Sequence, residues 1–440
     1  MNFCHSKKRN MIKRPISNIL LSNIQKDDLS LCLSLLFNAQ EQREGKILAY
    51  NEKTSQNGSF WPKNTDFNAI FSFNHLFSLN AGRSAFLAIL ECLELEKDSE
   101  IIIQAFTCTA LASPIIKAGF KPIYADIDDN LNIDPQSLEE KITDKTKAVV
   151  VQHTFGYPAQ IEKIQEICKK YNLLLIEDCA HCIGIKYKDK YLGQFGDISF
   201  FSFGRDKIIT AGYGGMIGTN SDLIAQRLKN YISNLDYPDK FWTFKQILHP
   251  ILINYFVLPF YNFGFIGKAF GKLFLILNLT SKSVYKKEKE GKWVNYFPKK
   301  MPGALKILAN NQLQKIEQFQ THRREICEFY IKNIPNGFSL VFKNEKDIQT
   351  SFMRFPILID NPDKKEKLLS CLEKKGIYLY DGWSDSVILP PDSNQEKFLY
   401  KKGSCPKAEN LAQKIINLPT HINLSTQDAQ YLITAIQQCK

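Results

Sequence analysis

The chain has 440 residues, of which 44% are hydrophobic and 23% charged, which is the composition of an ordinary globular protein. Lysine and arginine outnumber aspartate and glutamate by 57 to 45, giving a net charge of +12. This surplus suits an anionic ligand, nucleic acid or an anionic membrane surface, and alone it selects none of them. No basic cluster is interleaved with aromatic residues in an RNA-binding pattern, so we expect no nucleic-acid partner.

The eleven cysteines are scattered without a disulfide framework, which is typical of a protein in a reducing cytoplasm. One C-x-x-C pair occurs, at Cys179 and Cys182, and it has no second ligand pair nearby. We interpret it as two small apolar side chains, because a zinc site needs further ligands. The basic start of the chain is not followed by an apolar run long enough for a secretory signal. We therefore expect no metal site and a cytoplasmic location.

Residues 1–65 are predicted to form an N-terminal arm. The spacing of Leu29, Leu33 and Leu36 indicates an amphipathic helix over 27–37 that packs against another part of the protein. A polar stretch then leads to Pro62.

Residues 66–241 show an alternation of apolar strands and amphipathic helices. Strands are predicted over 71–79, 100–104, 121–125, 148–153 and 173–177. Helices are predicted over 82–93, 110–118, 134–141 and 160–171. Continuous apolar strands in this rhythm predict an α/β fold, with a mostly parallel sheet covered by helices on both faces.

Residues 242–290 interrupt the alternation and are predicted to form a hydrophobic helical insert. The chain carries no charge from Pro250 to Gly267, and five lysines follow between residues 282 and 292. A spanning helix needs ~20 apolar residues, and Pro259 and Gly264 interrupt this run, so a full span is disfavoured. Two interpretations stay open. The insert is either a helical pair buried in the protein or at a subunit contact, or an interfacial hairpin whose lysines meet anionic headgroups.

Residues 291–440 are predicted to form a smaller α+β domain that begins with a connecting helix. Apolar residues from Leu305 to Phe319 line one face of that helix. Strands are expected over 339–342 and 352–359, and helices over 363–375 and 426–438.

Polar residues follow several predicted strands at their carboxyl ends, where ligands bind in parallel sheets. Asp178 ends an apolar strand, and Lys207 lies in a polar turn after another. Taken singly, Lys207 is more often a solvated loop charge, and Asp178 a structural ion pair or a helix cap. Together they match what pyridoxal phosphate (PLP) needs, an amine that forms a Schiff base and a carboxylate that keeps the pyridine nitrogen protonated. The pair predicts a PLP enzyme.

Other residues at the same edge are candidates for cofactor contacts: Gly82, Arg83, Ser84, His181 and Ser202. His181 is expected to reach the cofactor ring or its phenolic oxygen. The glycine turn lies between a strand and a helix, where free backbone N–H groups and the helix dipole favour a phosphate. The arginine adds a fork of donors, and the two serines add hydroxyl groups.

Several segments carry a family likeness when they are taken jointly. They are 80–85 (NAGRSA), 125–128 (ADID), 153–159 (HTFGYPA), 176–181 (IEDCAH), 196–207 (GDISFFSFGRDK), 214–216 (GGM), 405–409 (CPKAE) and 416–419 (INLP). With them the sequence resembles the DegT/DnrJ/StrS-type family of PLP-dependent sugar aminotransferases, which belongs to the fold type I, aspartate aminotransferase-like superfamily. The likeness runs from about residue 45 to the end, apart from the insert, which marks a divergent branch.

The resemblance implies that Lys207 is the Schiff-base lysine and that Asp178 partners the pyridine nitrogen. It also implies that His181 lies near the ring and that Ser202, with the turn over 82–84, holds the phosphate. Members are usually homodimers and mostly use glutamate as the amino donor. Two departures stand out: Arg83 replaces a common threonine, and Cys108 occupies the position where many members stack an aromatic ring on the cofactor.

We therefore expect a PLP-dependent aminotransferase that moves an amino group, from glutamate, to a keto-sugar linked to a nucleotide or a lipid. Such chemistry belongs to cell-surface polysaccharide biosynthesis. We place the enzyme in the cytoplasm, with peripheral contact to the inner face of the membrane through 242–290. One alternative is a keto-sugar dehydratase, although the family's dehydratases typically carry histidine where this chain has Lys207. The other is a non-catalytic, membrane-tethered scaffold or regulator.

Overall fold

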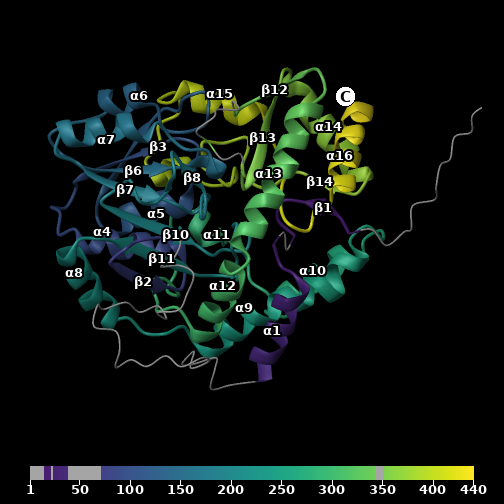
Figure 1. Ribbon diagram of the computed structural model, residues 1–440, viewed down its shortest axis with the longest axis horizontal. Coiled ribbons are helices and arrows are strands. Elements are labelled where there is room, and N and C mark those ends of the chain that lie inside the picture. The colour runs from purple at the N-terminus through teal and green to yellow at the C-terminus, as the bar shows by residue number, and fades with distance from the viewer. Residues whose placement is uncertain (1–13, 21–22, 38–70, 343–347, 349–350) are drawn as a thin grey trace, which may run out of the picture.

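The structure is a computed structural model that describes residues 14–20, 23–37, 71–342, 348 and 351–440. A seven-stranded sheet lies at the centre of the larger lobe (Figure 1). Its spatial order is β2 (His75–Leu79), β11 (Gly215–Thr219), β10 (Ile198–Ser202), β7 (Leu174–Asp178), β6 (Thr146–Gln152), β3 (Glu100–Gln104) and β5 (Lys121–Ala125). Strand β11 is antiparallel to both its neighbours, and the other adjacent pairs are parallel. The predicted α/β class with a mostly parallel sheet is confirmed.

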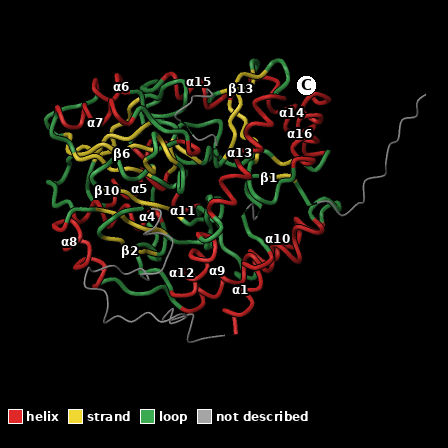
Figure 2. Tube along the Cα trace, viewed as in Figure 1, coloured by secondary structure: helices red, strands yellow, loops and turns green. Residues whose placement is uncertain are grey.

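Helices cover both faces of this sheet because alternate residues of the buried strands point to opposite sides. Ile102 and Val149 join an apolar cluster with Ile161 and Ile164 of one helix. Ile101 joins the main core on the other side. The helices of this lobe are α4 (Gly82–Cys92), α5 (Thr109–Lys117), α6 (Pro135–Glu140), α7 (Ile161–Lys170) and α8 (Asp222–Ser233). Figure 2 shows the yellow strands enclosed by these red helices.

The N-terminal arm packs against the rest of the protein, as predicted, but its helix buries Leu29, Cys32 and Leu35 and leaves Leu33 of the predicted face exposed. Strand β1 (Ile16–Ser17) pairs with β14 (Ile377–Tyr378). Helix α1 (Lys26–Phe37) contacts α9 (Lys240–Leu252) and α12 (Gly303–Leu313). The buried carboxylate of Asp28 accepts hydrogen bonds from Gln312 at 2.8 Å and Lys315 at 2.9 Å. The polar part of the arm, over 38–65, lies outside the described residues.

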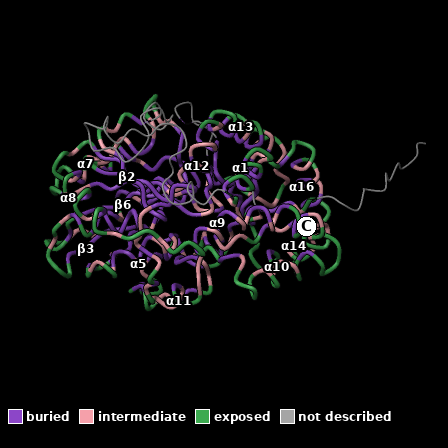
Figure 3. The backbone as a smooth tube through the Cα atoms, turned by 90° about the horizontal axis from the view of Figure 1, so that it is seen from below, coloured by how far each residue is buried: buried purple, intermediate pink, exposed green. Residues whose placement is uncertain are grey.

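The hydrophobic insert forms a helical hairpin. It comprises α9 (Lys240–Leu252), the short helical turns η3 (Ile253–Val257) and η4 (Leu258–Phe260), and α10 (Ile266–Ile276). Helix α9 is partly buried in the protein, whereas α10 lies at the rim of the molecule (Figures 1 and 3). Across the described residues, no helix has the length and apolar character needed to cross a membrane.

The remaining described residues form a second lobe around a three-stranded antiparallel sheet of β12 (Phe338–Leu340), β13 (Arg354–Ile359) and β16 (Ile415–Pro419). Its longer helices are α12 (Gly303–Leu313), α13 (Ile316–Asn333), α14 (Lys365–Lys374), α15 (Pro406–Lys414) and α16 (Thr426–Cys439). The single apolar face expected over 305–319 belongs to two helices. The chain leaves helical geometry at Lys315, whose ammonium group pairs with Asp27 and Asp28.

Two cysteines of the second lobe form a disulfide that the sequence spacing does not single out. Cys371 of α14 and Cys439 of α16 lie 68 residues apart, with their Cα atoms separated by 5.8 Å. The expectation of cysteines without a framework therefore does not hold for this pair. The other described cysteines, including Cys179 and Cys182, are free, and these two are buried as predicted.

Candidate active site

A cavity of about 560 Å³ opens at the carboxyl ends of the central strands. Seven of the eight predicted site residues line it: Gly82, Arg83, Cys108, Asp178, His181, Ser202 and Lys207. Each follows or ends a strand, so the parallel topology brings residues from distant parts of the sequence to one place. The convergence expected at the strand tips is present.

Asp178 is the last residue of β7 and is 7% exposed. One of its oxygens accepts a hydrogen bond from the backbone N–H of Ala180 at 2.9 Å. Burial raises the pKa of this carboxyl to about 6, although the Ala180 hydrogen bond and the nearby Lys207 act to lower it. Few interactions compensate the negative charge of this buried carboxylate, so a cationic partner inside the cavity would stabilise it.

Lys207 ends the turn that follows β10, and its side chain lines the cavity together with Asp178. The turn is fixed by main-chain contacts: the Lys207 N–H donates to the carbonyl of Gly204 at 3.1 Å. The Lys207 carbonyl accepts from the Asn23 side chain at 2.6 Å. Its ammonium group lies 5.9 Å from the centre of the Trp383 ring. The lysine backbone is thus anchored while its amine faces the cavity.

His181 is held as a neutral imidazole. Its Nδ1 accepts a hydrogen bond from the N–H of Phe155 at 3.3 Å, which leaves the proton on Nε2. Burial, with the positive charges of Lys207 and Arg354, lowers the pKa of His181 well below its usual value. Its ring stacks on Phe155 at 5.7 Å and meets the edge of Trp383 at 4.7 Å. This packing gives the cavity a rigid, uncharged ring beside Asp178.

The turn at Gly82 packs so closely on Ser202 that only glycine fits. A methyl group at Gly82 would lie 2.8 Å from Cβ of Ser202, and one at Gly215 would lie 2.4 Å from the carbonyl oxygen of Ala81. The first turn of α4 therefore rests directly on the ends of β10 and β11. Its backbone N–H groups are at the cavity wall, where a helix N-terminus favours a phosphate.

We expect Gly82→Ala to lower the affinity for PLP by about ten-fold to a hundred-fold, because overpacking of ~1–3 kcal/mol pushes α4 away from Ser202. Equilibrium dialysis with PLP measures this change. The matched control is Gly271→Ala in α10, where no atom lies within 4 Å of the added methyl group. Unchanged PLP affinity in Gly82→Ala would mean that this turn does not hold the cofactor phosphate.

Two predicted phosphate contacts differ from expectation. Ser84 does not line the cavity: it is fully buried, and its hydroxyl donates to Oδ1 of Asn80, four residues earlier, at 2.8 Å. The side chain of Ser84 is therefore not part of the proposed site. Arg83 reaches the cavity wall, but its guanidinium forms an ion pair with Glu288 and donates to the carbonyl of Ser283 at 3.1 Å. Arg83 therefore ties the cavity to the residues that follow the insert.

Cys108 lies in the short strand β4 (Thr107–Cys108), which pairs with β15 (Ile388–Leu389) of the second lobe. Its sulfur accepts from the N–H of Ala110 at 3.4 Å and so caps α5. The aromatic side chain that the sequence lacks at this position is present elsewhere on the wall, at Trp383. Sequence reasoning missed this tryptophan, since nothing in its local pattern connects it with the strand tips.

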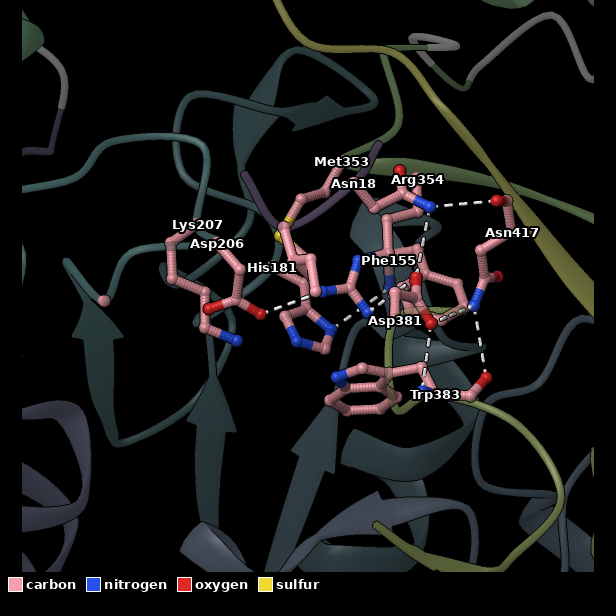
Figure 4. Close-up of polar contacts among 12 residues, drawn as sticks. Asn18, Phe155, His181, Asp206, Lys207, Met353, Arg354, Asp381, Trp383 and Asn417 are labelled. Carbon is pink, nitrogen blue, oxygen red and sulfur yellow. Dashed lines mark hydrogen bonds and ion pairs between the residues drawn. The ribbon is translucent and has the colours of Figure 1, made fainter. Parts of the chain in front are cut away.

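Sequence reasoning also missed a buried ionic network behind the catalytic-lysine candidate (Figure 4). Arg354, the first residue of β13, is 1% exposed and donates to Asp206 at 2.8 Å. Its other terminal nitrogen lies 3.1 Å from Asp381. Burial acts to raise the pKa of Asp206, but Lys207 and Arg354 outweigh it, so this pKa lies below its usual value. The network joins the Lys207 turn to the loop that carries Trp383.

We expect Arg354→Met to destabilise the protein by about 3–5 kcal/mol, because it leaves two carboxylates buried without their cation. Urea unfolding followed by circular dichroism gives the change. Lys188→Met is the matched control: Lys188 pairs with Glu162 at 2.7 Å on the surface, and such pairs contribute about 0–1 kcal/mol. A loss no larger than that of the control would show that the Arg354 pairs are not needed for stability.

The mostly parallel sheet brings Asp178, Lys207 and the glycine turn to one cavity, which is the arrangement expected from the sequence for an aminotransferase. A family model described as the DegT/DnrJ/EryC1/StrS aminotransferase family matches residues 50–243 and 276–437. The chain belongs to this family, and it is an aminotransferase. The match omits 244–275, which contains most of the helical hairpin.

Relatives and solved structures agree with this assignment. The chain is 29% identical over 363 residues to the GDP-perosamine synthase of Escherichia coli O157:H7, covering 82% of this chain and 84% of that protein. The structure of PseC from Helicobacter pylori, an aminotransferase involved in the biosynthesis of pseudoaminic acid, has a TM-score of 0.70 and 22% identity, covering 97% of this chain and 99% of that one. NtdA from Bacillus subtilis with bound cofactor PMP has a TM-score of 0.69 and 19% identity, covering 99% and 86%.

Proposed function

We propose that this protein binds PLP in the cavity and transfers an amino group from glutamate to a keto-sugar. The observation that carries the proposal is the placement of Asp178 and Lys207 on the wall of one cavity at the strand tips. PLP supplies an aldehyde that accepts an amine and a ring that takes up electrons when its nitrogen is protonated.

The residues present fit this cofactor. The buried Asp178 carboxylate, whose pKa burial raises to about 6, offers the partner that a protonated pyridine nitrogen needs. The close packing of Gly82 on Ser202 exposes backbone donors where a phosphate would bind. Neutral His181, packed between Phe155 and Trp383, limits how the ring can lie.

Each residue then has a defined task. Lys207 would hold the cofactor through its amine, and the same amine would move the proton on Cα of glutamate. Asp178 keeps the pyridine nitrogen protonated. Glutamate leaves as a keto acid, and the carbonyl carbon of the sugar gains the amino group, so the nitrogen passes from donor to acceptor.

The acceptor is a keto-sugar joined to a diphosphate. Support comes from the name of the Escherichia coli relative, which includes GDP, and from the net charge of +12. We further propose a cytoplasmic homodimer, as in other family members, with 66–241 as the cofactor-binding domain and 291–440 as the smaller domain. A dehydratase or a non-catalytic scaffold is disfavoured because the Asp178 and Lys207 pair is intact.

Isotope transfer tests the proposal. The purified enzyme is incubated with PLP, ¹⁵N-glutamate and a panel of keto-sugars, free, nucleotide-linked and lipid-linked, and the products are analysed by mass spectrometry. We expect ¹⁵N in the sugar product of at least one acceptor. Loss of water from the sugar without nitrogen uptake would identify a dehydratase, and an absence of PLP binding would identify a scaffold.

A further inference from the structure

Helix α10 is an apolar helix that its own protein leaves largely uncovered. Of its eleven residues only Gly267 is buried. Phe265, just before the helix, is 77% exposed, and Ile276 at its end is 81% exposed. Surface helices of globular proteins normally bury their apolar stripe, and exposed apolar patches mark sites of interaction. We call the exposed side of the hairpin the apolar face; it includes Tyr255, Phe260, Phe263, Phe265, Ile276 and Leu277.

The apolar face is ordered by contacts among the aromatic rings of the hairpin. The ring of Phe256 lies 6.4 Å from Phe270 and 6.0 Å from Phe274, and Phe260 lies 6.1 Å from Phe270. A methyl group at Gly267 would lie 2.5 Å from the backbone nitrogen of Tyr261, so glycine lets α10 approach η4 closely. These contacts hold α10 against the η3 and η4 turns of the same hairpin.

The charged side chains of the hairpin itself are all positive, and Glu290 pairs with Lys286 at 3.9 Å just after it. No acidic residue occurs between Asp239 and Glu288 in the sequence, whereas seven lysines do. Lys268 and Lys272 lie on α10, and Lys286 and Lys287 follow the hairpin; all four are exposed. An apolar surface bordered by lysines is complementary to an anionic lipid surface, where acyl chains cover the former and headgroups pair with the latter.

The same hairpin reaches the active-site cavity. His249 of α9, Ile253 of η3 and Leu275 of α10 line the cavity, as do residues 281–284 that follow. Part of the cavity wall and the apolar face are thus formed by one structural unit. The family model leaves out 244–275, so most of this unit lies outside the residues that match the family.

We propose that the apolar face docks this enzyme on an anionic lipid bilayer and thereby places the opening of its cavity at the membrane surface. The docking is peripheral, because the hairpin lies along the rim of the molecule and the described helices include none fit to span a bilayer (Figure 3). It goes beyond the proposed amino transfer and does not depend on which acceptor is used.

Vesicle sedimentation of the full-length protein tests the docking. We expect the wild-type protein to sediment with phosphatidylglycerol vesicles, and much less with phosphatidylcholine vesicles or at high salt. The double variant Phe265→Ser/Ile276→Ser should partition at least about ten-fold less, since two anchoring side chains are lost. Lys272→Glu/Lys287→Glu should lose the preference for anionic lipid. The matched control is Leu223→Ser on α8, a residue that is 63% exposed and far from the hairpin in sequence.

Soluble-phase measurements complete the test. The variants should keep the wild-type rate of amino transfer from glutamate in the absence of lipid, because none of the changed residues lines the cavity. A wild-type protein that stays in the supernatant with anionic vesicles, or a double variant that sediments like the wild type, would overturn the proposal. So would a change in the oligomeric mass of the double variant in analytical ultracentrifugation, which would assign the apolar face to a second copy of the chain.

Discussion

Lys207→Ala is expected to abolish amino transfer while leaving the fold intact. The substitution removes the amine that holds the cofactor and moves the Cα proton, and the acid–base part alone amounts to about 10²-fold to 10⁴-fold in rate. The backbone contacts of the turn, from Lys207 to Gly204 and from Asn23 to Lys207, survive in alanine. Thermal unfolding should therefore change little, since the lysine side chain is not one of the buried groups.

Stopped-flow absorbance of PLP with glutamate measures the rate, and Lys229→Ala on the exposed side of α8 is the matched control. Added ethylamine should restore part of the activity of Lys207→Ala, because a small amine can enter the space that the side chain vacates. Retention of more than a few per cent of wild-type activity without added amine would refute the role assigned to Lys207.

Asp178→Asn is expected to cause the second large loss of activity. The amide cannot hold a proton on the pyridine nitrogen by charge, and removal of such an electrostatic interaction costs about 10²-fold to 10³-fold in kcat. Steady-state kinetics at saturating glutamate and acceptor checks this. Asp189→Asn, in the turn between β8 (Lys186–Tyr187) and β9 (Lys190–Tyr191), is the control and should behave as the wild type.

Asp178→Asn should lower kcat, but it should raise the stability of the cofactor-free protein. Burial raises the pKa of Asp178 from 3.8 to about 6 in the folded protein. The folded state therefore binds this proton more tightly than the unfolded state, and stability falls as pH rises through this range. At pH 7 the ionised carboxylate costs about 3 kcal/mol, which Asp178→Asn removes.

Urea unfolding of the two cofactor-free proteins at pH 4 and pH 7 tests this linkage. The variant should be the more stable protein at pH 7, and the difference should shrink toward pH 4, where both side chains are neutral. Equal stability of the two proteins at pH 7 would show that Asp178 is already compensated without the cofactor.

The sequence allowed the convergence of Asp178 and Lys207 on one cavity to be predicted because it depends on local patterns. Asp178 ends a continuous apolar strand, Lys207 follows another, and parallel strands bring their carboxyl ends together. The hydrogen bond of Ser84 could also have been predicted from the local sequence. A serine in the first turn of a helix can donate to a side chain four residues earlier, as it does to Asn80.

The rest of the site depends on pairings between distant segments, which a single sequence does not reveal. Arg83 meets Glu288, and Arg354 meets Asp206 across 148 residues. Trp383 reaches the cavity from a loop of the second lobe and has no periodic pattern around it. The insert was recognised by composition alone, and only its folding shows that α10 is exposed while α9 is partly buried.

The ionic network next to Lys207 joins residues from both ends of the chain, so the site is complete only when nearly the whole chain has been synthesised. Asn18 donates to the carbonyl of Asn417, 399 residues away, and both side chains bond to Asp381. A nascent chain that already contains Asp178 and Lys207 therefore lacks their support until strand β16 has left the ribosome. Contacts of such long range form late in folding. A chain truncated before β16 would contain Lys207 and Asp178, yet would lack the contacts that complete the cavity around them.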